Sequence, residues 1–231
     1  MRRLWPWRTA GRIRHFRCGL SRPGDRANAP DMREILPGVL TWPWFSERHG
    51  YDFNGYLLRL PGGNLCVDPV EMPGEVLEGI VAAGVQRIVL TNRNHFRASM
   101  KVKERTGAPI AIHPADAAFA RGKGAAIDED LRPGQRLGPL EVVAAPGKSP
   151  GEVALYWPEQ RTLLVGDACV GKPPGSCALL PDAVIDDKAR LLDSLRMLAQ
   201  LDFDALLLGD GAPILSGGRA ALGRLLEGTP R

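Results

Sequence analysis

The chain has 231 residues, of which 44% are hydrophobic and 24% are charged, a balance typical of a globular chain with one large domain or two small ones. No apolar run approaches the roughly 18 residues of a membrane helix, which excludes a membrane protein and, with this composition, a disordered one. The formal net charge is +4, but residues 1–30 hold eight Arg against one Asp and so carry +7, which leaves 4 − 7 = −3 for the remainder. A mildly acidic body does not favour binding to nucleic acid.

The basic start of the chain differs from the rest. Its uncharged stretches are too short for the apolar segment of a secretory signal. We predict a disordered leader over residues 1–31, or a segment that is not translated if synthesis starts at Met32; a mitochondrial presequence and a nucleic-acid-binding arm are the alternatives. Residues 32–231 then form the domain. The excess of Arg over Lys indicates a GC-rich genome, and hence a bacterial, cytoplasmic protein.

In the first half of the domain, short strands come first and then alternate with helices. Apolar runs bounded by turn residues predict strands over 39–41, 56–60, 64–67, 87–90 and 110–113, with Pro61-Gly62-Gly63 as a hairpin turn. Helices are predicted over 75–83 and 97–105, and a third begins at Pro114.

The second half repeats this order. Strands are predicted over 135–137, 141–144, 153–157, 162–165 and 206–208, and amphipathic helices over 187–200 and 219–226. Two β-rich halves, each closed by helices, predict two sheets packed face to face with helices outside.

Four cysteines without a CxxC pair indicate neither a zinc knuckle nor a disulfide framework. Cys66 lies in a strand-like run and is predicted to be a buried thiol. Cys169 follows a strand end and is expected near the site.

Most of the polar residues of interest lie in four loops that each follow an apolar strand. The loops are Thr-Asn-Arg-Asn-His-Phe-Arg at 91–97, Pro-Gly-Lys-Ser-Pro-Gly at 146–151, Gly-Asp-Ala at 166–168 and Gly-Asp-Gly at 209–211. Loops at strand ends are where sheet proteins build their sites. We therefore expect these four loops to form one site.

Residues 145–156, the Gly-Asp loop within 163–171 and the turn Val67-Asp68-Pro69 resemble motifs of the metallo-β-lactamase superfamily, in particular of its glyoxalase II-like hydrolases. The resemblance covers roughly residues 35–216. It implies an α/β (α+β) fold, a four-layer αββα sandwich, with the site along one edge of the two sheets.

The metal-binding positions of that family have changed here. Its motif Thr-His-x-His-x-Asp-His falls on residues 91–97, so that the ligand positions of the motif carry Asn92, Asn94, Phe96 and Arg97. A histidine ligand from a later loop of the family falls on Lys148, and the last histidine ligand falls on Asp210. Only the bridging aspartate is kept, as Asp167. Zinc requires imidazole, thiolate or carboxylate ligands, and Lys and Arg repel a cation. The resemblance thus implies that the zinc site is lost, and we predict no metal and no cofactor. His95 falls on a spacer position, where its side chain should point away from the metal side.

The replacements suggest that side-chain cations stand in for the metal. Lys148 would pair with Asp167, and Arg97 with Asp210, because a buried carboxylate without a partner costs several kcal/mol. Asn92 and Asn94 could donate amide hydrogens to the same carboxylates. The alternative is that these residues are separate and solvated.

Two functions follow. The first is a metal-independent pseudo-hydrolase that binds a small anionic or carbonyl ligand through Asn92, Asn94, Arg97 and Asp210, or an interaction scaffold.

The second is an active hydrolase of esters, thioesters or lactones. Its oxygen donors would hold Mg²⁺ or Ca²⁺, or His95 or Asp167 would act as general base with Lys148 or Arg97 stabilising the oxyanion; a nucleophilic Lys148 is a further option. Nucleic-acid binding through the basic leader is a third, separate alternative.

Overall fold

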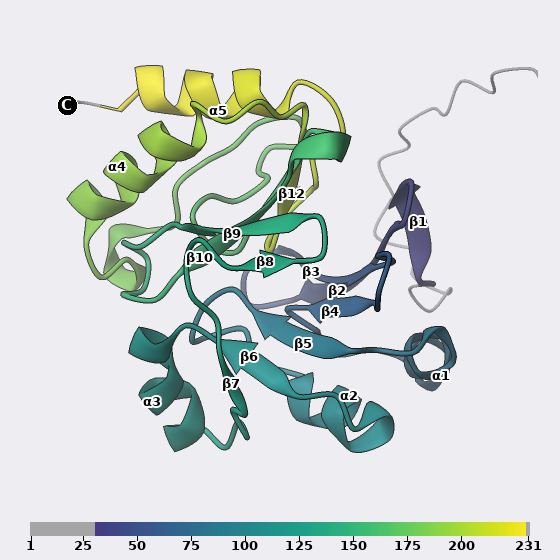
Figure 1. Cartoon of the computed structure of the whole chain (residues 1–231). Coiled ribbons are helices and arrows are strands. Elements are labelled where there is room, and N and C mark those ends of the chain that lie inside the picture. Colours follow the sequence, from purple (N-terminus) through teal and green to yellow (C-terminus); the bar gives the residue numbers. More distant parts are fainter. Residues whose placement is uncertain (1–30, 230–231) are drawn as a thin grey trace, which may run out of the picture.

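The computed structural model describes residues 31–229, which form two mixed sheets between two sets of helices (Figure 1). The first sheet runs in the order β1 (Arg33–Leu36), β2 (Val39–Ser46), β3 (Tyr51–Leu58), β4 (Leu65–Val67), β5 (Arg87–Leu90), β6 (Ile110–Ile112) and β7 (Glu129–Asp130). Its first four strands are antiparallel, and β4 to β7 are parallel. The basic leader predicted over residues 1–31 lies almost entirely outside the described residues.

The second sheet runs in the order β12 (Ala205–Leu208), β11 (Thr162–Val165), β10 (Val153–Trp157), β9 (Leu140–Ala144) and β8 (Arg136–Leu137). Only β11 and β12 are parallel. Short 3₁₀ turns cover Pro158–Gln160 and Asp182–Val184.

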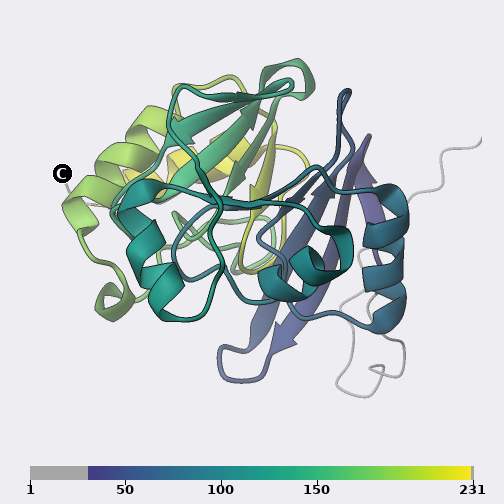
Figure 2. The same ribbon diagram turned by 60° about the horizontal axis from the view of Figure 1, so that its bottom comes forward.

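The helices form the outer layers (Figures 1 and 2). α1 (Gly74–Ala83), α2 (Ser99–Thr106) and α3 (Pro114–Gly122) lie with the first sheet, and α4 (Lys188–Leu198) and α5 (Gly218–Glu227) lie with the second. None of the described helices is long and apolar enough to cross a membrane.

Three hydrophobic clusters fill the three spaces between these four layers. Successive residues of a strand alternate between clusters: Leu207 of β12 lies between the sheets, whereas Leu206 and Leu208 pack toward α4 and α5. In β5, Val89 likewise faces the second sheet while Ile88 and Leu90 face the helices. This two-residue period of strands that are buried on both faces confirms the predicted αββα sandwich.

The differences from the predicted elements are shifted ends of strands and helices and two short additional strands. β2 and β3 are longer than expected because their hairpin pairs from Val39 and Leu58 out to Ser46 and Tyr51. β1 and the two-residue β7 were not predicted, since neither carries an apolar run. α2 starts at Ser99 rather than at residue 97, because residues 91–98 form the turns of the site loop. Cys66 is buried, as predicted.

Hydrogen bonds from β3 join the two sheets at the edge where the four loops meet. The Asn54 amide donates to the carbonyls of Leu208 and Gly211 at 2.9 and 2.7 Å, and the Tyr56 hydroxyl donates to Leu208 at 2.7 Å. The end of β12 and the loop after it are thereby held against β3.

Candidate functional site

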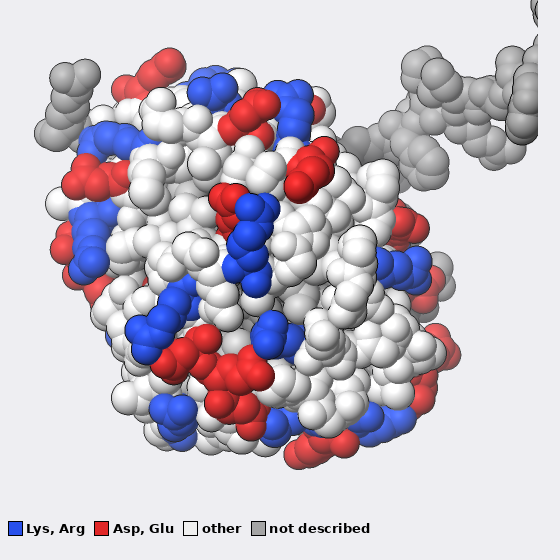
Figure 3. All heavy atoms as spheres, in the orientation of Figure 1, with Lys and Arg blue, Asp and Glu red and all other residues white. Residues whose placement is uncertain are grey.

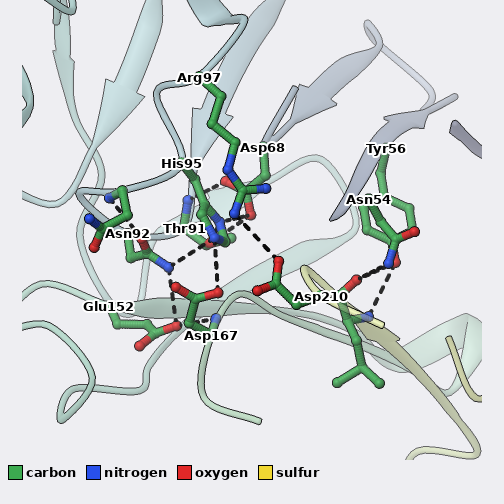
Figure 4. Close-up of polar contacts among 12 residues, drawn as sticks. Asn54, Tyr56, Asp68, Thr91, Asn92, His95, Arg97, Glu152, Asp167 and Asp210 are labelled. Atoms are coloured by element: carbon green, nitrogen blue, oxygen red, sulfur yellow. Dashed lines mark hydrogen bonds and ion pairs between the residues drawn. The ribbon is translucent and has the colours of Figure 1, made fainter. Parts of the chain in front are cut away.

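The centre of the site is His95, whose imidazole is fully buried between two carboxylates (Figure 4). Its Nδ1 lies 2.9 Å from Asp68 Oδ2, and its Nε2 lies 3.0 Å from Asp167 Oδ1. Burial alone would lower the pKa of His95, but the charges of Asp167 and Asp68 outweigh it and raise the pKa to about 9. At neutral pH the ring is therefore an imidazolium that can donate a hydrogen bond from each nitrogen.

Two further cations contact carboxylates beside the histidine. Lys148 Nζ lies 2.7 Å from Asp167 Oδ2, and both side chains are more than nine-tenths buried. Arg97 Nη2 lies 3.4 Å from Asp210 Oδ1. Burial would raise the pKa of Asp167, but the positive charges of His95, Lys148 and Arg97 hold it well below its ordinary value. The structure thus contains both ion pairs that the sequence suggested.

The expected orientation of His95 is wrong. It was placed on a spacer position that faces away from the site, whereas its ring lies between Asp68 and Asp167. The turn over 91–98 is compact, and His95 N donates to Asn92 O at 3.2 Å. The loop thereby directs the side chain of His95 toward the site.

The expected role of the two asparagines also needs correction. Asn92 Nδ2 donates to Glu152 at 3.4 Å, and Asn94 accepts a 2.6 Å hydrogen bond from Lys148 Nζ. Neither amide donates to Asp167 or Asp210, so Asn94 adds an acceptor to the lysine instead of a donor to the acids.

Three buried acids of the site, Asp68, Glu152 and Asp116, were not predicted. Asp68, at the end of β4, has a positive φ of 47° and accepts hydrogen bonds from Thr91 N and Oγ1 at 2.8 and 2.5 Å. Glu152 Oε1 accepts from the backbone N of Asp167 at 2.6 Å, and burial, followed by the charge of Asp167, raises the pKa of Glu152 to about 8. The turn Val67-Asp68-Pro69 was recognised, but nothing in it indicated that its acid would reach the histidine.

Asp116, at the start of α3, fixes the two longest loops relative to each other. Its buried carboxylate accepts from Arg93 N at 2.9 Å, Ser149 Oγ at 2.5 Å and Gly151 N at 3.0 Å. His113 accepts a hydrogen bond from Ala115 N and so caps the same helix. The hydrogen bonds of Asp116 therefore set the spacing between the loop that carries His95 and the loop that carries Lys148.

A cavity of about 860 Å³ opens over this network. Asn94, Arg97, Lys148, Asp167 and Asp210 lie on its floor and walls. The remaining lining residues come from the β2–β3 hairpin, from the loop 91–97, from α3 and from the segment that leads to α4; they are Arg48, His49, Tyr51, Phe53, Arg93, Phe119, Val170, Lys172, Ala178, Leu179, Leu180, Pro181, Ala183, Val184 and Asp186.

The charges of the network balance without an added ion. Burial, assisted by the charge of Asp167, raises the pKa of Asp210 to about 6, so this acid is ionised at pH 7 while most of Glu152 is protonated. Three cations, on His95, Lys148 and Arg97, then face three carboxylates, on Asp68, Asp167 and Asp210.

Donor atoms of His95, Asp167 and Asp210 lie within 4.8 Å of one another, close enough for a metal ion. Each of these residues, however, is already in contact with an oppositely charged side chain. A zinc ion at about 2.0–2.3 Å from its ligands needs a neutral imidazole and free carboxylate oxygens. As they stand, the residues do not fit such an ion.

Known structures share this fold. The structure titled TTHA1623 in a di-iron-bound form is 26% identical, with a TM-score of 0.63, and the match covers 80% of this chain and 98% of that one. A metallo-β-lactamase from Pontibacter korlensis is 18% identical with a TM-score of 0.71, covering 87% and 100% of the two chains. The metallo-β-lactamase FIM-1 from Pseudomonas aeruginosa, in a mono-zinc form, is 16% identical with a TM-score of 0.69, covering 87% and 96%.

A search of curated protein sequences found no significant match. The sequence profile described as the metallo-β-lactamase superfamily matches residues 32–229, nearly the whole described part of the chain. Together with the two-sheet, four-layer fold, this match shows that the chain belongs to the metallo-β-lactamase superfamily.

Proposed function

We propose that this protein is a metal-independent pseudo-hydrolase, derived from the glyoxalase II-like branch, that binds a small anionic or carbonyl ligand in the cavity above His95. The observation that carries the proposal is the contact of three cationic side chains with the carboxylates at the centre of the site. A buried carboxylate needs compensating positive charge, and here side chains supply it. The bacterial, cytoplasmic setting expected from the sequence belongs to the same proposal.

Ligand binding by the cavity is supported by its size and lining. A volume of about 860 Å³ lies within the range of small-molecule sites, and charged groups on the floor with apolar walls are typical of them. On the face shown in Figure 3, basic and acidic side chains are interspersed rather than gathered in one basic stripe, so a small molecule is a better candidate than nucleic acid.

Metal content tests the proposal directly. The protein is purified without chelator, incubated with zinc or ferrous iron, desalted and analysed for metals. A matched variant restores four of the six changed family ligands through Asn92→His, Asn94→His, Arg97→His and Lys148→His. We expect stoichiometric metal on the variant and only trace metal on the natural chain; stoichiometric metal on the natural chain would overturn the proposal.

The grouping of His95, Asp167 and Asp210 within 4.8 Å favours one second candidate, an active hydrolase with an atypical metal or with none. Hydrolysis of simple esters, thioesters and lactones is its test. Turnover that disappears in both Asp167→Ala and His95→Gln would support this candidate, and equal background rates for all three proteins would exclude it for these substrates.

A further inference from the structure

The cavity carries more positive than negative side chains. Its lining includes five basic residues, Arg48, Arg93, Arg97, Lys148 and Lys172, and three acidic ones, Asp167, Asp186 and Asp210. Each acid pairs with one of the bases, with Asp186 bound to Arg93 at 2.7 Å. Within the described residues, Arg48 and Lys172 have no carboxylate partner. The cavity therefore has two uncompensated positive charges.

Aromatic rings of β3 hold two of the cations next to each other. Tyr51 and Phe53 lie two residues apart on one face of the strand, and their ring centroids are 6.0 Å apart. Lys172 Nζ lies 5.2 Å from the Tyr51 ring, and the Arg97 guanidinium carbon lies 4.1 Å from the Phe53 ring. A ring attracts a cation without neutralising it, so the charge of Lys172 remains available to an anion. Arg97 lies beside it with only one long ion pair, 3.4 Å to Asp210.

Two arginines that line the cavity have buried side-chain nitrogens without a hydrogen-bond partner. The side chain of Arg97 donates only one long bond, 3.4 Å to Asp210, and its Nη1 has no partner; Arg93 Nε also has none. Buried donors without acceptors are costly. The other buried side-chain atoms without a partner in the described part of the chain are Ser99 Oγ and Glu152 Oε2, and neither residue lines the cavity. Two arginines of the cavity lining therefore keep side-chain nitrogens that no acceptor of the protein satisfies.

Another wall of the cavity is apolar. It consists of Val170, Leu179, Leu180, Pro181, Val184 and Phe119. Val184 and Phe119 are 51% and 40% exposed, so a ligand lying on them would remove large apolar surfaces from water. A bare inorganic anion would leave this wall uncovered.

We propose that the cavity binds an organic anion with an apolar body. Its charged group lies between Lys172 and Arg97, with Arg48 at the mouth, and its body lies on the wall around Leu179 and Val184. This inference rests on the proposed function and goes beyond it, because it selects an anion over a neutral carbonyl compound. Carboxylates, sulfonates and phosphate monoesters share the required chemistry.

Two fluorescent probes that differ only in charge test the inference. 8-Anilino-1-naphthalenesulfonate carries the anionic group, and N-phenyl-1-naphthylamine is its neutral analogue. In the variant Arg48→Gln/Lys172→Gln we expect the Kd of the sulfonate to rise about tenfold, because two exposed positive charges are removed from the cavity. The Kd of the neutral probe should change less than about twofold. The charge-matched control is Arg59→Gln/Arg190→Gln, at two exposed positions outside the cavity.

A third variant, Ala183→Trp, fills the cavity from its lining and should weaken both probes. Sulfonate binding that survives Ala183→Trp, or that is unchanged in Arg48→Gln/Lys172→Gln, would overturn the inference. If both probes bind with equal affinity and both are lost in Ala183→Trp, anion selection fails while ligand binding stands; the metal assay decides the proposed function separately. Displacement by octanoate or by octyl phosphate assigns a carboxylate or a phosphate head group, and displacement by neither contradicts the inference.

Discussion

The charge state of His95 gives a sharp prediction of how stability depends on pH. Its pKa is about 9 in the folded protein against 6.5 for the free side chain, and each pKa unit corresponds to about 1.4 kcal/mol. Because the folded value is raised, the stabilisation is fully present below pH 6.5 and is lost as the pH rises through 9. The expected loss from this one group is about 3 kcal/mol.

Glu152 must be separated from this effect. Its pKa is raised from 4.5 to about 8, so its protonated form also favours the folded state, and stability falls as the pH rises from 4.5 to 8. The free energy of unfolding, measured with urea from pH 6 to 10, is therefore compared between Glu152→Gln and Glu152→Gln/His95→Gln. The second variant should lack about 3 kcal/mol of the pH dependence.

A direct measurement does not depend on the stability of any variant. Nitrogen chemical shifts of the His95 ring in the natural protein, followed from pH 5 to 10, should show both nitrogens protonated until about pH 9. A ring that loses its proton below pH 7 would refute the raised pKa of His95. The neutral imidazole would then be free to bind a metal.

Three other outcomes are expected. In a double-mutant cycle of Lys148→Ala and Asp167→Ala, each single change should lower the free energy of unfolding by about 3–5 kcal/mol, because it leaves a buried charge alone. The two effects should be non-additive by about 1 kcal/mol or more. Additive effects in urea unfolding would mean that the residues are not coupled. Gly166→Ala should cost about 1–3 kcal/mol, since its Cβ would overlap the Thr91 hydroxyl, whereas Gly223→Ala, in α5 with open space around it, should be neutral or stabilising; equal effects would contradict the packing. Dialysis against EDTA should leave the Tm unchanged, and a fall of several degrees would indicate a bound structural ion.

The fold could be predicted because its signals are local. Alternating or continuous apolar runs with Gly and Pro at their ends place most strands, and the loop motifs at 91–97 and 146–151 carry the resemblance. The pairings of Lys148 with Asp167 and of Arg97 with Asp210 followed from one physical requirement, that a buried acid needs a cation.

The rest of the site depends on contacts that no local pattern encodes. The direction of His95 is set by tertiary contacts, in which Asp68 holds Thr91 and Asp116 holds the backbone of Arg93. Glu152 is a single acid without a recognisable spacing. Most of the apolar cavity wall belongs to the segment between β11 and α4, which has little regular structure. A segment without helix or strand has no hydrophobic periodicity from which its position could be predicted.

The hydrogen bonds of Asp116 affect how this site can change during evolution. Since one aspartate ties the backbone of one loop to the other, the gap between them stays constant when the residues that face the gap are exchanged. An uncharged residue that faces the gap can then change alone, whereas exchange of a buried charge such as Lys148 also requires a change of its partner Asp167. The same backbone can in this way acquire a site for a different ligand while the positions of its loops are kept.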